Sequence, residues 1–379
     1  MKILYISYAK HGGGWWIHTS EFLAAIRSLH KDVLSYTPLA VSPSAGATSL
    51  KKSEYVTGPF REMRYLAVVF LRRALGELRE MRKHRPDAVI LRWGRYLSAL
   101  LLCRMMKIPI LVELNGPILE EQFAPKAERF RWLPFWQRFE KTVLKLPSHI
   151  MVVSEPLREY YIKCGIPEEK ISVLPNGVDT ARFHPANDGR NIREKLNLQD
   201  KTVVGFSGHF APWHGLDFLI EAMQEVMRSR KDIVLLLTGQ RNTRVDLPEL
   251  PENTIITGLV PHEEMPDYLA AVDIFVAPYP QIDLFYFSPL KIFEAMSAGK
   301  AVLASAQGQI CELIEPEQSG LLYPAGDRKI FLQHLYRLID DAAFRKYLGE
   351  NARRRMEEHY TWEHNAQRVL HQCRMSVQK

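Results

Sequence analysis

The sequence has little cysteine and no long apolar run. Its 379 residues include four cysteines, which are widely spaced and form no C-x-x-C pair. This spacing excludes a zinc ribbon and argues against a disulfide framework, so we expect a reducing cytosol. No stretch reaches about 18 uncharged apolar residues, the length that crosses a bilayer. The opening MKILYISYAK lacks the long apolar region and cleavage site of a signal peptide, and we interpret it as a buried strand.

Charge is unbalanced toward the basic side, with a formal net charge of +7. The excess gathers in residues 61–85 and 126–145, and the second segment interleaves Lys and Arg with Phe and Trp. Such segments favour an anionic leaflet, with Trp132, Phe135 and Trp136 as anchors. The alternative is that the apolar residues pack inward and the arginines are solvated. We expect a cytoplasmic protein, with these segments as candidates for peripheral contact with the inner face of the membrane.

Nucleic acid is disfavoured as a partner, because no recognised binding module accompanies the charge.

Short apolar runs alternate with helical segments twice along the chain. Near-continuous runs such as IVLLL are typical of strands buried on both faces, hence of a parallel sheet. Regular strand–helix alternation predicts α/β domains with doubly wound sheets, which bind ligands in a cleft at the carboxyl ends of their strands. We predict two Rossmann-like domains facing a central cleft, residues 1–174 and 175–361, with three helical stretches from about residue 327 onward. Strands are predicted at 2–7, 88–91, 110–114, 149–153, 171–174, 202–206, 233–237, 254–257, 274–277, 301–304 and 320–323.

The segment FSPLKIFEAMSAGKAVLAS, residues 287–305, carries the strongest chemical signal. Ser288 is expected to cap a helix whose first residue is Pro289. Free backbone N–H groups at such a helix start suit a phosphate. Lys291 adds a cation in the first turn, and Glu294 adds a carboxylate that can accept both hydroxyl protons of a ribose. A plain amphipathic helix is the alternative, and Lys291 counts against it because a cation there opposes the helix dipole.

At this point the chain resembles the family 4 glycosyltransferases, retaining enzymes of the GT-B fold. The segment above is similar to their donor-binding segment, and VLPNGVDTARFHP (173–185) resembles their signature at the start of the second lobe. VVGFSGHFAPWHGLDFLIEAM (203–223) resembles the first strand–loop–helix of that lobe. GLLYPAGD and ENARRRMEEHYTWEHNAQRVL resemble the terminal helices. The resemblance implies that the last helix, about 362–379, crosses back to the first domain. The first half matches more weakly, through its opening and ILVELNGPILEE.

The resemblance implies transfer of a sugar from a UDP- or GDP-linked donor to a sugar or lipid-linked acceptor, with retention of anomeric configuration, in building a cell-surface polysaccharide or glycoconjugate. It also implies that no metal and no cofactor is needed. Glu294 would bind the ribose and Lys291 the diphosphate. The remaining donor-binding candidates of the second domain are Gly208, Gly239, Val260, Ser288, Pro289 and Leu290.

Two departures from the family pattern affect the expected chemistry. His209 and His214 stand where relatives commonly carry an arginine and a lysine that neutralise the diphosphate, and we take them as catalytic candidates together with Lys291. Tyr286 replaces the first glutamate, which contacts the donor sugar, and Asp283 is close enough in sequence to substitute. These departures motivate an alternative, a non-catalytic nucleotide-binding partner subunit of another glycosyltransferase.

The first domain offers weaker signals. A run of three glycines ending in Gly13 and Gly14 permits close approach to the donor, but it lacks the G-x-G-x-x-G spacing of dinucleotide sites, which disfavours a nicotinamide oxidoreductase. Asn115 fits the position at which relatives contact the sugar, and we count it among the catalytic candidates; an Asn-Gly turn is the alternative. Arg92 and Arg95 either hold an anionic acceptor or are solvated loop charges.

Overall fold

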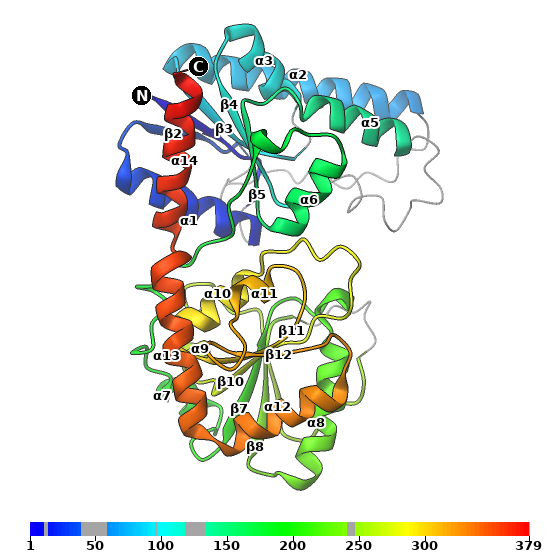
Figure 1. The fold of residues 1–379 in the computed structure, drawn as a ribbon, viewed down its shortest axis with the longest axis vertical. Coiled ribbons are helices and arrows are strands. Elements are labelled where there is room, and N and C mark those ends of the chain that lie inside the picture. The colour runs from blue at the N-terminus through cyan, green and yellow to red at the C-terminus, as the bar shows by residue number, and fades with distance from the viewer. Residues whose placement is uncertain (11–13, 39–58, 95–96, 118–132, 241–246, 379) are drawn as a thin grey trace. The chain divides into compact units, whose positions relative to one another are not determined.

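The computed structural model describes residues 1–10, 14–38, 59–94, 97–117, 133–240 and 247–378, with backbone alone at 59–69 and 133–137. The chain divides into two compact units (Figure 1). The first unit is Met1–Pro175 together with Trp362–Lys379, and the second unit is Asn176–Thr361. The sequence placed the joint between residues 174 and 175.

The first unit is built on a six-stranded parallel sheet of order β2-β1-β3-β4-β5-β6. The order reverses between β1 and β3, so the loops after these two strands flank the switch point at which doubly wound sheets bind ligands. The strands are β1 (Ile3–Ile6), β2 (Val33–Tyr36), β3 (Ala88–Arg92), β4 (Ile110–Leu114), β5 (His149–Val152) and β6 (Ile171–Val173). The helices are α1 (Gly14–Leu29), α2 (Pro59–His84), α3 (Leu97–Met106), α5 (Leu133–Val143), α6 (Glu155–Lys163) and α14 (Trp362–Val377).

Strand β2 was not predicted from the sequence. Its four residues, VLSY, contain one fully buried side chain, Val33. It lies at the edge of the sheet, paired with β1 alone. An edge strand this short has neither a continuous apolar run nor a long alternation, and those are the signals that mark a strand.

The second unit repeats the plan with strand order β12-β11-β10-β7-β8-β9. Here the reversal lies between β7 and β10, which places a second switch point there. The strands are β7 (Thr202–Ser207), β8 (Ile233–Thr238), β9 (Thr254–Gly258), β10 (Ile274–Ala277), β11 (Ala301–Ser305) and β12 (Leu321–Tyr323). The helices are α7 (Arg190–Lys195), α8 (Leu216–Ser229), α9 (Met265–Ala270), α10 (Leu290–Ser297), α11 (Ile310–Leu313), α12 (Arg328–Asp340) and α13 (Ala342–His359).

Side chains on both faces of the second sheet are buried, as the apolar run in β8 predicted. One cluster on this sheet includes Phe275 and Phe293, and the other includes Phe206 and Leu235. Helices cover the sheet on both sides (Figure 1).

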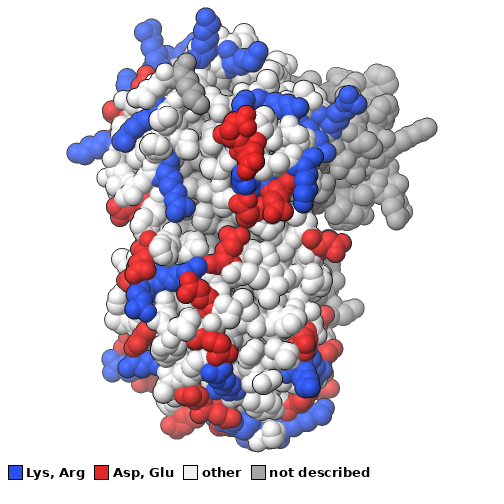
Figure 2. All heavy atoms as spheres, in the orientation of Figure 1, with Lys and Arg blue, Asp and Glu red and all other residues white. Residues whose placement is uncertain are grey.

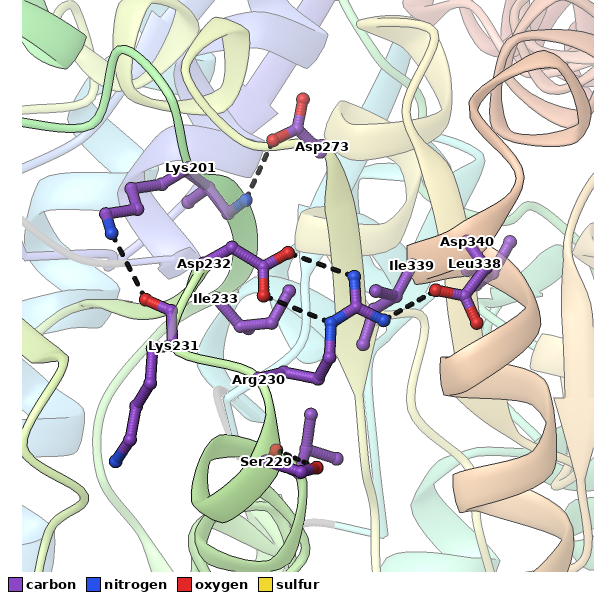
Figure 3. A network of polar contacts seen from close by, with 12 residues as sticks. Lys201, Ser229, Arg230, Lys231, Asp232, Ile233, Asp273, Leu338, Ile339 and Asp340 are labelled. Carbon is purple, nitrogen blue, oxygen red and sulfur yellow. Dashed lines mark hydrogen bonds and ion pairs between the residues drawn. The ribbon is translucent and has the colours of Figure 1, made fainter.

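Charged side chains tie together the amino ends of β7 and β8, the edge opposite the switch-point loops (Figure 3). Arg230 makes two hydrogen bonds to Asp232, of 3.0 and 2.9 Å, and one of 2.5 Å to Asp340 at the end of α12. Lys201 Nζ donates to the Lys231 carbonyl at 3.1 Å. These contacts hold the amino edge of the sheet together, opposite the carboxyl edge at which doubly wound sheets bind ligands.

Helix α14 returns to the first unit, where it packs against α1 and β3. The ring of Trp362 lies 5.0 Å from that of His18 and 6.4 Å from that of Phe22, between ring centroids. Asn365 Nδ2 donates to the Pro175 carbonyl at 2.6 Å. The crossing of the last helix to the first unit, which the resemblance implied, is confirmed. No helix in the described ranges is long and apolar enough to span a bilayer.

Candidate functional site

Two glycines bring the loops after β7 and β8 into backbone contact. Gly208 has φ +135 and Gly239 has φ +154, values that side-chain-bearing residues rarely adopt. A Cβ on Gly239 would lie 1.9 Å from the Gly208 carbonyl oxygen, so only glycine fits there. At two of the sequence-predicted positions on the carboxyl edge of the second sheet, backbone therefore packs directly on backbone, with Gly208 half-buried and Gly239 buried.

Lys291, in the first turn of α10, points its ammonium into this edge. The Nζ atom lies 4.4 Å from the ring centroid of Phe206 and 5.2 Å from that of Tyr279. A Cβ on Gly208 would be 3.0 Å from it. The atom is buried and has no hydrogen-bond partner among the described residues. Burial lowers the pKa of Lys291 from 10.5 to about 7, against the attraction of Glu294. A buried cation without a partner is costly, and an incoming anion would supply the missing partner.

Helix α10 begins one residue later than predicted. Its N-cap is Pro289, and no side chain among the described residues caps it. The expectation that Ser288 caps the helix is wrong, because its hydroxyl accepts a hydrogen bond of 2.9 Å from the Asn176 N–H instead. Asn176 Nδ2 also donates to the Ser288 carbonyl at 2.5 Å. The segment leading to Leu290 is thus fixed by Asn176, and the helix start remains uncapped by side chains, beside Lys291.

Glu294 lies further along α10 and is paired with a residue that sequence reasoning missed. His262, in the segment between β9 and α9, approaches Glu294 Oε1 to 3.0 Å with its Nε2 atom. Arg182 Nη1 lies 3.3 Å from the other ring nitrogen, Nδ1. Both partners of the pair are largely shielded, with side-chain exposures of 16% for His262 and 11% for Glu294. The one sequence clue was that His262 comes two residues after Val260, a predicted donor-binding position.

His214 lies beside Lys291 but is uncharged in the free protein. Burial first, and then the charge of Lys291, lower the pKa of His214 from 6.5 to about 3. Its Nδ1 lies 2.5 Å from the His209 carbonyl oxygen. A carbonyl can only accept, so Nδ1 carries the proton and Nε2 is an acceptor. In the protein without ligand, His214 therefore does not supply the positive charge that the relatives' basic residue would carry. The buried cationic group here is Lys291.

The other predicted residues of the second unit surround this group. His209 is exposed on the loop after β7, and Val260 is half-buried against the core. Tyr286 is half-buried, with its ring centroid 4.4 Å from that of Phe287, whereas Asp283 is exposed. The structure thus brings Gly208, Lys291 and His214 together, with Glu294 further along the same helix.

In the first unit, a buried ion cluster lies beneath the start of α1. Glu113 on β4 accepts a hydrogen bond of 2.7 Å from Arg92 Nη1 on β3 and contacts His18 Nε2 on α1. Burial alone would raise the pKa of Glu113, but the contacts with His18 and Arg92 outweigh it and hold the pKa at about 2. The alternative that Arg92 is a solvated loop charge is wrong, since it is 4% exposed and donates to Glu113. The cluster ties three elements together at the switch point.

Of the remaining residues predicted in the first unit, only some lie within the described part of the chain. Gly14 is the first residue of α1 and is exposed, and Asn115 follows β4 with a buried Oδ1 that has no partner among the described residues. Gly13 and Arg95 lie outside the described residues. Within the described ranges, no group of three or more His, Cys, Asp or Glu side chains is arranged to hold a metal ion.

Two family models match the chain. The model described as Glycosyltransferase Family 4 matches residues 12–182, and the model described as Glycosyl transferases group 1 matches residues 201–341. The second match lies wholly in the second unit and contains Lys291, Glu294 and His262.

Curated relatives are matched over part of their length. The GDP-mannose-dependent monoacylated alpha-(1-6)-phosphatidylinositol monomannoside mannosyltransferase of Corynebacterium glutamicum is 31% identical over 207 residues, 52% of this chain and 54% of the relative. The lipopolysaccharide 1,2-N-acetylglucosaminetransferase of Salmonella typhimurium is 27% identical over 252 residues, 62% of this chain and 64% of the relative. The chain thus covers less than two thirds of either protein.

Solved structures resemble the whole chain. Sucrose-phosphate synthase from Thermosynechococcus elongatus superimposes with a TM-score of 0.75 at 20% identity, covering 99% of this chain and 98% of that one. HepE from Anabaena, solved in complex with UDP-glucose, gives a TM-score of 0.71 at 18% identity, covering 98% of this chain and 99% of that one. At these identities the likeness shows the fold, and the two-domain GT-B fold predicted from the sequence is confirmed.

Proposed function

Because the chain belongs to the family 4 glycosyltransferases, we propose that it transfers a sugar from a nucleoside diphosphate sugar to an acceptor, with the donor held by the second unit. The observation that carries this proposal is the buried ammonium of Lys291, which has no hydrogen-bond partner in the described part of the chain and lies at the uncapped start of α10. A diphosphate there would meet Lys291 and the free N–H groups of the helix start. Glu294, further along the same helix, would accept the ribose hydroxyls.

The proposed reaction proceeds with retention. The acceptor hydroxyl attacks the anomeric carbon on the face that the diphosphate leaves, the bond from that carbon to the diphosphate oxygen breaks, and the proton passes to the departing diphosphate. The protein's task is then to stabilise charge that develops on the diphosphate. Lys291 is the residue for this task, because its ammonium is desolvated at this edge and the developing negative charge favours its protonated form. His214 can add a donor once an anion raises its pKa.

The test is donor binding and turnover of two variants. We expect Lys291→Met and Glu294→Gln to weaken binding of UDP or GDP, measured by calorimetry, and Lys291→Met to lower kcat as well. Lys201→Met is the matched control, since its ammonium donates to the Lys231 carbonyl and lies near Asp232, at the opposite edge of the sheet. Product NMR reads the anomeric configuration. If Lys291→Met transfers sugar at the wild-type rate, the assignment of Lys291 is wrong.

A non-catalytic partner subunit is the second candidate, favoured by Tyr286 in place of an acidic residue. The two candidates differ in turnover. A protein that binds the nucleotide-sugar but neither transfers nor hydrolyses it, when supplied with lipid-linked and free acceptors, is the partner subunit.

We propose further that the acceptor is lipid-linked and that α2 brings the enzyme to an anionic membrane. Leu71 and Leu75 of α2 are 58% and 67% exposed, and exposed Arg72, Arg79 and Arg82 flank them. Blue side chains gather at the top of the first unit in Figure 2. Two relatives act, by their names, on a phosphatidylinositol mannoside and on lipopolysaccharide. Of 126–145, the side chains described begin at residue 138, so the anchors Trp132, Phe135 and Trp136 stay a prediction.

Vesicle flotation tests the membrane proposal. We expect binding to vesicles containing phosphatidylglycerol, weaker binding to neutral vesicles, and loss of binding in Leu71→Gln/Leu75→Gln with unchanged nucleotide affinity. Equal binding by the double variant would show that α2 is not the contact.

A further inference from the structure

We propose that His262 and Arg182 are positioning residues that aim the Glu294 carboxylate at the ribose of the donor. The inference rests on the proposed function, since it assigns a task to the surroundings of the same site. Neither residue was expected from the sequence to take part in it. Both are brought to Glu294 by the fold, from the segment after β9 and from the segment before α7.

The hydrogen bond from His262 selects one orientation of a flexible side chain. Fixing a flexible glutamate side chain costs conformational entropy, a cost that ligand binding would otherwise bear. His262 Nε2 holds Oε1 at 3.0 Å. Within the described residues nothing else bonds to the carboxylate, so Oε2 is left for a ligand. The carboxylate is thus preorganised, with Oε1 fixed by His262 and Oε2 available to accept a hydrogen bond from a ligand.

Arg182 fixes the proton of His262 on the useful nitrogen. A guanidinium can only donate, so its approach to Nδ1 at 3.3 Å makes Nδ1 the acceptor. The proton of the neutral ring therefore lies on Nε2, facing Glu294. In the other tautomer two lone pairs, those of Nε2 and Oε1, would face each other, and the guanidinium of Arg182 disfavours that tautomer.

The segment that carries Arg182 is fastened to the helix that carries Glu294. The Phe183 carbonyl accepts hydrogen bonds of 2.7 Å from Ser297 Oγ, in the last turn of α10, and from Arg353 on α13. The ring of Phe183 packs on His262, with 5.5 Å between ring centroids. Arg182, His262 and Glu294 therefore form one rigid group rather than three independent side chains.

This arrangement predicts a selective effect on ribose recognition. We would titrate UDP, GDP and their 2′,3′-dideoxy forms into wild type, His262→Ala, His262→Phe, His262→Gln, Arg182→Met and Glu294→Gln. His262→Ala and His262→Phe should weaken binding of the ribonucleotide about tenfold, the value of one hydrogen bond to a charged group. The affinity for the dideoxy nucleotide should not change. His262→Gln keeps a donor near the Nε2 position and should retain most of the affinity for the ribonucleotide. Arg182→Met should weaken that affinity by less than His262→Ala does.

The controls separate this inference from the proposed function. His359→Ala removes an exposed histidine 3.8 Å from Glu358 and should change nothing. His262→Phe retains a ring against Phe183, so it tests the hydrogen bond if the alanine variant unfolds. If the His262 variants lose both nucleotide forms equally, or lose neither, the positioning role is wrong, whereas ribose discrimination that depends on Glu294 leaves the function standing. If wild type binds neither UDP nor GDP, the proposed function itself fails.

Discussion

Lys291 shows how one residue sets a conflict between stability and binding. Its ammonium is desolvated, which lowers its pKa from 10.5 to about 7. A bound diphosphate would favour the charged form and raise this pKa again. Two predictions follow from that difference, one for the bound state and one for the free protein.

Nucleotide affinity should fall as pH rises above neutrality. Between about pH 7 and the higher pKa of the complex, binding UDP or GDP takes up one proton, so Kd rises by up to roughly tenfold per pH unit. Titration calorimetry at pH 7.5 and pH 9, in buffers of different ionisation heat, measures both Kd and the proton uptake. In Lys291→Met we expect neither the rise of Kd with pH nor the proton uptake. An equal pH dependence of Kd in that variant would refute the assignment.

Lys291→Met should also stabilise the protein without ligand. The folded pKa lies below the unfolded value, so between about pH 7 and 10.5 the unfolded chain holds the extra proton and wild-type stability rises with pH through that window. The gain from the substitution is therefore largest at and below pH 7, at roughly 1–3 kcal/mol. Denaturant unfolding at pH 6.5 and pH 9 checks the value, and a destabilised variant at pH 6.5 would contradict it.

At this scale the sequence revealed part of the site. Lys291 and Glu294 were predictable because they share a short helix with a turn signal before it. His262 and Asn176 were not, because their partners, Glu294 and Ser288, are 32 and 112 residues away in the chain. The burial of Arg92 was missed for the same reason, since its partner Glu113 lies on a neighbouring strand.

At the scale of elements, the strand ends after β7 and β8 require glycine. Gly208→Ala should destabilise the protein by about 1–3 kcal/mol, because φ +135 strains any side chain. It should also weaken donor binding, since the new Cβ would lie 3.0 Å from Lys291 Nζ and displace it. Thermal unfolding with and without UDP or GDP measures both effects.

Gly326→Ala is the matched control for Gly208→Ala. Gly326 has φ +82 in the same unit, with nothing within 4 Å of its added Cβ. The Gly326→Ala variant should lose stability but keep the wild-type affinity for UDP or GDP. If Gly208→Ala keeps full affinity, the loop after β7 does not contact the donor.

Elements that are buried along their length were predicted correctly from the sequence. Strands such as β8, buried along its whole length, were visible as apolar runs. Strand β2 was missed, and α10 starts one residue after its predicted start because Asn176 takes the hydroxyl that was expected to cap it. Local patterns identify buried elements well, and they fail where a distant residue competes for a side chain.

At the scale of the whole molecule, α14 is the element that closes the first unit. Deleting residues 362–379 removes Trp362 from His18 and Phe22 and uncovers the buried face of α1. We expect the first unit to lose its cooperative transition while the second unit keeps its own. Hydrogen exchange should then become fast in β1 and β3 and stay slow in β7 and β8. Retained protection in β1 would show that the first unit folds without α14.

The return of α14 to the first unit also determines the order in which the two units can complete their folding during translation. The second unit is encoded as one uninterrupted stretch whose ends meet, since Val178 pairs with Thr361 and its N–H donates to the Tyr360 carbonyl at 2.9 Å. That stretch can fold as soon as it emerges. The first unit, although translated first, waits with part of its apolar surface uncovered until α14 leaves the exit tunnel. The half of the nascent chain that begins earliest is thus the last to be complete.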